Sequence, residues 1–130
     1  MTNRFEFTGT PVPKPRMTRA DNWKKRPIVE KYWTFKDKIN IQAKKQNFVL
    51  GRAYKVTFVM PLPKSISAKE KAKRLGQAHV IRPDLDNMLK SLNDTLMKED
   101  SGVFYVVCQK MWGEEGKIIV ENLPECLDLS

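Results

Sequence analysis

The 130-residue sequence contains little of what a disulfide framework or a zinc site requires, with two cysteines and one histidine. The spacing between Cys108 and Cys126 matches no zinc-binding pattern, so we expect a reduced, cytoplasmic setting. No run of apolar residues approaches the length of a membrane span, and no signal peptide opens the chain. We therefore expect no membrane segment and no stabilising disulfide.

Acidic residues are scarce in the first two thirds of the chain. Residues 1–82 hold 20 Lys and Arg against 5 Asp and Glu, which leaves +15, whereas residues 83–130 hold 4 against 10, which leaves −6. A basic body joined to an acidic cluster suits a protein that binds a polyanion with one part and places carboxylates on it with another. Bare carboxylates would repel phosphate, so this arrangement needs a cation.

The hydrophobic pattern predicts one globular domain over residues 1–130, since 41% of the residues are hydrophobic. Alternating apolar residues predict strands at 4–8, 54–60, 103–111 and 117–121, the last two forming a hairpin. Apolar residues at helical spacing predict helices at 29–45 and 85–96, and a capping box predicts a short helix at 67–75. Residues 9–26 form a proline-rich loop. This order predicts an α+β fold, a small mixed β-sheet covered by helices.

Two carboxylates, Asp84 and Asp86, stand at the start of the third predicted helix, directly after Pro83. Proline is tolerated in a first turn, and the helix dipole keeps nearby carboxylates ionised. Lys90 lies one turn after Asp86 on the same face. Carboxylate oxygens hold a hard divalent cation, and an ammonium group meets a phosphate. The alternative is a helix cap followed by a solvated surface pair.

Basic residues that could follow a phosphate backbone are concentrated in the proline-rich loop, in the short helix and just before the aspartates. In the loop, Trp23 is either a platform for an unpaired base or a core residue. The single histidine, His79, either packs locally or serves the neighbouring site. The candidates for DNA contact are Lys14, Arg16, Arg19, Lys24, Lys25, Lys73, Arg74 and Arg82.

The stretch 82–87 with Lys90, followed by Glu99-Asp100-Ser101, resembles the K-P-D-x-D-N-x-x-K motif and later acidic pair of the RusA family of Holliday junction resolvases. The segment 13–16, the basic helix and His79 agree more weakly. The resemblance implies a homodimer that cuts four-way DNA junctions with paired nicks, using Mg²⁺ or Mn²⁺. It also implies a bacterial or phage-infected cell as the setting.

By position in that motif, the resemblance implies metal binding by Asp84, Asp86 and Asp100, with Lys90 as the catalytic lysine. The segment between Lys90 and the acidic pair is shorter than in the family, which leaves Glu99 as an alternative to Asp100. Two other functions stay open at this point. One is a basic DNA-binding phage protein without catalysis, and the other is a nuclease that prefers flaps or forks.

Overall fold

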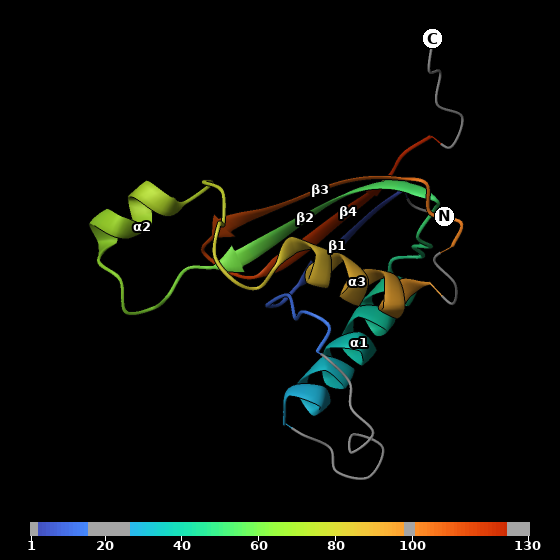
Figure 1. Ribbon diagram of the computed structural model, residues 1–130, viewed down its shortest axis with the longest axis horizontal. Coiled ribbons are helices and arrows are strands. Elements are labelled where there is room, and N and C mark those ends of the chain that lie inside the picture. The colour runs from blue at the N-terminus through green and yellow to red at the C-terminus, as the bar shows by residue number, and fades with distance from the viewer. Residues whose placement is uncertain (1–2, 16–26, 98–100, 125–130) are drawn as a thin grey trace.

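A computed structural model describes residues 3–15, 27–97 and 101–124. It shows a two-layer α+β domain, in which a mixed four-stranded sheet carries α1 and α3 on one face while α2 projects to the side (Figure 1). This confirms the predicted fold class. Each predicted strand and helix is present, with ends shifted by no more than two residues. The elements are β1 (Arg4–Thr8), α1 (Pro27–Lys45), β2 (Ala53–Pro61), α2 (Ala68–Arg74), α3 (Leu85–Leu96), β3 (Tyr105–Gly113) and β4 (Lys117–Asn122).

The strand order is β1-β4-β2-β3, so the predicted hairpin of β3 and β4 is wrong. Strand β2 lies between them, parallel to β3 and antiparallel to β4. The short connection from β3 to β4 passes the end of β2, where the Leu62 N–H donates to the Gly113 carbonyl at 3.0 Å. A Cβ on Gly113 would lie 2.3 Å from Val59 Cγ1, so this position requires glycine. The short connection between β3 and β4 is typical of a hairpin, but β2, the most apolar strand, lies between them.

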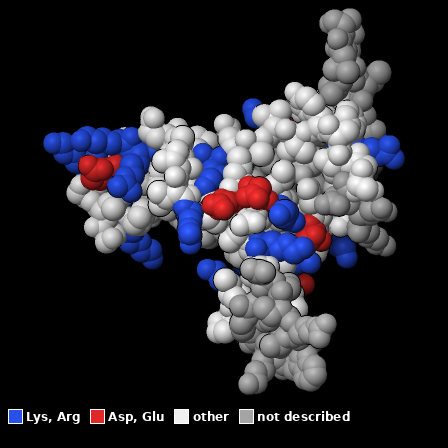
Figure 2. Space-filling view, viewed as in Figure 1, with Lys and Arg blue, Asp and Glu red and all other residues white. Residues whose placement is uncertain are grey.

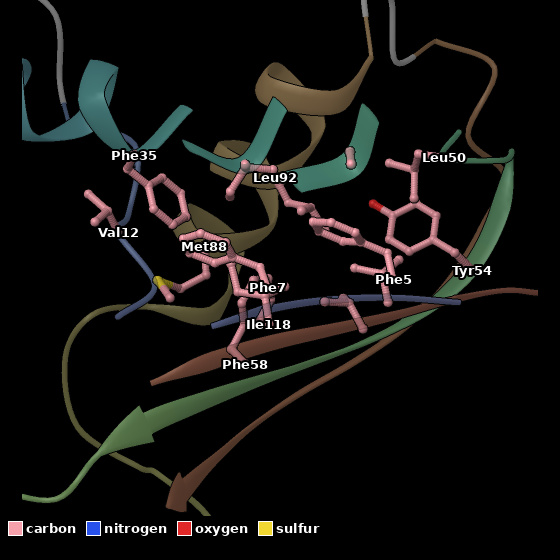
Figure 3. Close-up of a cluster of buried hydrophobic side chains, with 14 of the residues drawn as sticks. Phe5, Phe7, Val12, Phe35, Leu50, Tyr54, Phe58, Met88, Leu92 and Ile118 are labelled. Carbon is pink, nitrogen blue, oxygen red and sulfur yellow. The ribbon is translucent and has the colours of Figure 1, made fainter. Parts of the chain in front are cut away.

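The hydrophobic core lies between the sheet and the two helices, and side chains from both layers point into it (Figure 3). Tyr54, Val56, Phe58 and Met60 of β2 are buried in this core, and on the other face of the strand Lys55 is exposed although Ala53 and Thr57 are also buried. On α1 the buried residues recur at helical spacing, as Val29, Tyr32, Phe35, Ile39 and Ala43, whereas Ile28 is 51% exposed. From α3, Met88 and Leu92 are each 1% exposed. This burial fixes which face of α3 is left for solvent.

Helix α2 makes no contribution to the core, because none of its residues is buried. Its start is set by Ser67, whose hydroxyl oxygen accepts from the Glu70 N–H at 3.2 Å, as the capping-box pattern predicts. Among the helices of the described residues, none combines the length and apolar character needed to cross a bilayer.

Candidate functional site

The exposed face of α3 carries the residues singled out by the sequence. Asp84 is the N-cap residue, with φ −68° and ψ 142°, yet its side chain makes no capping hydrogen bond. Asp86 lies in the first turn, and both aspartates are exposed. The carboxylate of Asp84 is therefore not used as a cap and is left available for a ligand.

Lys90 lies one helical turn after Asp86 and is exposed as well. Both residues are described by the structure, and no ion pair joins them. Acidic and basic side chains gather along this face of α3, between the basic helix α2 and the body of the molecule (Figure 2). Lys90 is thus one turn from Asp86 on the same face of α3, without an ion pair between the two side chains.

The predicted metal site has a third carboxylate, which follows α3 in the sequence. Asp100 and its alternative Glu99 lie outside the described residues. Within residues 3–15, 27–97 and 101–124, no group of three His, Cys, Asp or Glu side chains could hold a metal ion. Of the predicted metal ligands, the described structure includes Asp84 and Asp86, both exposed at the start of α3.

The segment before α3 is attached to β3 by backbone hydrogen bonds. Trp112 N–H donates to the Gln77 carbonyl at 2.9 Å, and His79 N–H donates to the Lys110 carbonyl at 3.1 Å. Ala78 and Met111 form an antiparallel bridge between these two bonds. Residues 77–79 therefore extend the sheet by a short edge segment and bring the chain toward Asp84.

Lys110 continues this attachment with its side chain. Its ammonium group donates to the Ile81 carbonyl at 2.7 Å and also to the Pro83 carbonyl. The Arg82–Pro83 peptide bond between these acceptors is cis. The sequence analysis missed Lys110, although a lone charged residue on the covered side of an otherwise apolar strand was a usable signal.

His79 packs against the sheet. It is 5% exposed, its ring centroid lies 4.4 Å from that of Trp112, and its Nδ1 has no hydrogen-bond partner among the described residues. Burial lowers the pKa of the imidazole, and the positive charge of Lys110 lowers the pKa further. The ring is therefore held neutral in a packing role.

Lys14, predicted to contact DNA, is bound to α3. Its N–H donates to the Asn87 carbonyl at 3.3 Å, and its ammonium lies 2.6 Å from an Asp94 carboxylate oxygen. Tyr32 donates to the same carboxylate at 3.2 Å. Burial alone would raise the pKa of Asp94, but the hydrogen bond and charge of Lys14, helped by Tyr32 and Lys36, lower the pKa overall. The Lys14 ammonium thus anchors the N-terminal segment to the helix that carries the site.

The other predicted DNA contacts divide into two groups. Arg16, Arg19, Lys24 and Lys25 lie outside the described residues, as does Trp23. The remaining three lie in the described part of the chain, Lys73 and Arg74 on α2 and Arg82 directly before Pro83. The guanidinium of Arg74 lies 5.6 Å from the centre of the Trp112 ring. A pocket of about 380 Å³ opens here, lined by Lys73, Arg74, Gln77, Ala78, Val80, Ile81 and Trp112.

The sequence was compared with curated proteins and with models of protein families. A search of curated proteins gives no match. The family model described as Endodeoxyribonuclease RusA matches residues 8–121, a range that includes the three helices, the segment before α3 and strands β2 and β3 in full. Because the match spans most of the 130 residues, the chain belongs to the RusA family of endodeoxyribonucleases.

Proposed function

We propose that the protein is a Mg²⁺-dependent endodeoxyribonuclease that resolves four-way DNA junctions by paired nicks. The chain belongs to a nuclease family, and one observation on its structure carries the proposal. Two exposed aspartates begin α3, the carboxylate of Asp84 is not used as a cap, and an exposed lysine follows one turn after Asp86. This donor set fits a hard cation, because Mg²⁺ and Mn²⁺ prefer carboxylate oxygens.

In this mechanism each residue of the helix face has a separate task. Asp84 and Asp86 hold the cation, and the helix dipole favours their ionised forms. When bound, a divalent ion polarises the scissile phosphate and lowers the pKa of a bound water. The Lys90 ammonium stabilises the negative charge that grows on the phosphate as the P–O bond breaks. Exposure of all three side chains leaves room for a DNA strand.

A homodimer is part of the proposal, with Asp100 as the third ligand and Glu99 as the alternative. Asp84 occupies the N-cap position at the start of α3, and Met97 follows the other end of the helix. A twelve-residue helix is ~18 Å long, so this distance separates Asp84 from the last described residue before the acidic pair. A second copy could supply its Asp100 without crossing that length. Two sites related by a two-fold axis also match the paired strands of a junction.

The basic residues near the site support binding of the junction arms. Lys73 and Arg74 line a pocket with Ile81, Arg82 lies two residues before Asp84, and phosphate contacts by such residues weaken as salt is added. Without a bound cation, the two carboxylates would repel the same phosphates. The proposed setting is the cytoplasm of a bacterial or phage-infected cell, where branched DNA and Mg²⁺ are both present.

The test is cleavage of a labelled four-way junction by the full chain in Mg²⁺ and in EDTA. Asp84→Asn and Asp86→Asn should each lower the rate by at least about 10²–10³-fold, while junction binding is retained. Asp37→Asn, at an exposed carboxylate of α1, is the matched control and should cut at the wild-type rate.

Wild-type cleavage by both aspartate variants would refute the site. Cleavage that needs no divalent ion would refute the metal. A flap and a plain duplex of the same sequence distinguish the substrates, and faster cutting of the flap would favour the alternative nuclease. Binding of the junction without cleavage by the wild-type chain would favour a non-catalytic DNA-binding protein.

A further inference from the structure

The chain that leads into the candidate site has few contacts of its own. Between His79 and Asp84, the side chains of Val80 and Ile81 are 84% and 59% exposed, and Arg82 is exposed too. Burial of apolar side chains therefore does not fix this segment, although it enters α3 directly at the first aspartate. Something else must define its path.

Two kinds of hydrogen bond tie the segment to β3. Up to His79 the bonds are between backbones, ending with His79 N–H to the Lys110 carbonyl at 3.1 Å. Beyond His79, the described hydrogen bonds from β3 come from the Lys110 ammonium, which donates to the carbonyls of Ile81 and Pro83. Lys110 thus accepts the last backbone hydrogen bond from the segment and donates its side chain to two of the next four residues, Ile81 and Pro83.

The position of Lys110 in the strand makes this contact specific. Its neighbours on the same face, Cys108 and Trp112, pack against the core, so the Lys110 side chain rises from the covered side of the sheet toward the segment. Hydrogen bonds from a charged donor are stronger than neutral ones, and two acceptors fix the ammonium from two directions.

We propose that Lys110 is a positioning residue for the metal site, which fixes the backbone at Pro83 and thereby aims the carboxylates of Asp84 and Asp86. The inference rests on the proposed function, because it assigns these carboxylates to a cation. Lys110 acts through the Ile81 and Pro83 carbonyls and touches neither the cation nor the DNA. Groups that orient ligands in this way typically change metal affinity about 10–100-fold when removed.

The experiment compares Lys110→Met with the wild-type chain in the absence of DNA. Mn²⁺ binding is followed by the electron paramagnetic resonance signal of the free ion, and amide hydrogen exchange is followed over residues 80–88. Lys110→Met should weaken Mn²⁺ binding by about 10–100-fold and speed exchange in this segment, with β2 and β4 unchanged. Saturating Mn²⁺ should restore most of the junction cleavage, since the carboxylates themselves remain.

Two further variants control for charge and for donor capacity. Lys55→Met removes an exposed lysine from β2, the strand next to β3, and should match the wild type in both measurements. Lys110→Arg keeps a charged donor at the same place and should recover most of the affinity for Mn²⁺.

Wild-type affinity and wild-type exchange in Lys110→Met would overturn the inference. So would weaker junction binding with unchanged Mn²⁺ affinity, which would mean that Lys110 contacts DNA. Faster exchange throughout the sheet, together with a lower unfolding temperature, would assign Lys110 a general structural role instead. A wild-type chain that binds no Mn²⁺ would refute the proposed metal site itself, an outcome distinct from an intact wild-type site that Lys110→Met leaves unchanged.

Discussion

Leu92→Ala should separate the two faces of α3, and the structure allows its size to be worked out. Leu92 is 1% exposed and belongs to the core cluster. The substitution removes three carbon atoms, each worth about 0.8 kcal/mol of transfer free energy when buried. The space left behind adds a further loss of packing, so the free energy of unfolding should fall by about 3–5 kcal/mol in total.

Urea unfolding followed by circular dichroism measures this loss. Ile41→Ala is the matched control, because Ile41 lies on α1 and is 53% exposed. Its unfolding free energy should change by no more than about 0.5 kcal/mol. Cleavage by Leu92→Ala should stay close to the wild-type rate at a temperature where both proteins are folded, since Asp84, Asp86 and Lys90 lie on the exposed face.

Two results would refute this reasoning. A loss of less than about 1 kcal/mol would mean that Leu92 is not packed as the structure shows. A cleavage rate that falls with stability, in molecules shown to be folded, would mean that the core face of α3 takes part in the site.

Two other predictions follow from charges and from the proposed dimer. Burial, and then the charge of Lys110, lower the pKa of His79 below 6.5, so the folded state binds a proton more weakly than the unfolded state. The contribution of His79 to the free energy of unfolding is therefore complete above this pH and decreases as the pH falls below it. The unfolding temperature should drop more between about pH 7 and pH 5 for the wild type than for His79→Phe, and equal drops would contradict the prediction. If the third ligand comes from a second copy, mixing inactive Asp84→Asn with inactive Asp100→Asn should restore nicking at one site in each mixed dimer. A mixture as inactive as its components would assign Asp100 to the site of its own chain.

Local patterns in the sequence were sufficient to predict most elements of the fold. Strand β1 begins and ends at the predicted residues, and α3 begins directly after Asp84, because proline and aspartate mark a helix start locally. The strand order was not predictable in the same way. Whether β4 pairs with β3 depends on where β2 inserts, and the contact that permits the crossing, between Gly113 and Val59, forms only in the folded chain.

The candidate site shows the same division. Asp86 and Lys90 are one turn apart on α3, so their common face follows from helical periodicity, and Asp84 directly precedes the helix as its N-cap residue. Lys110 donates to carbonyls 29 and 27 residues earlier in the chain, so a lone lysine in an apolar strand marks the residue as unusual but does not identify its partners. Likewise, Lys14 looks like a free cation in the sequence, and only the fold reveals its pairing with Asp94.

The isolation of α2 has a consequence for how the protein can change. A substitution in this helix opens no cavity, since no residue of the helix is buried. Its positive charge can therefore vary in amount and spacing at almost no penalty to folding. If α2 contacts DNA as proposed, selection can adjust the affinity for DNA through this helix while the stability of the domain stays the same.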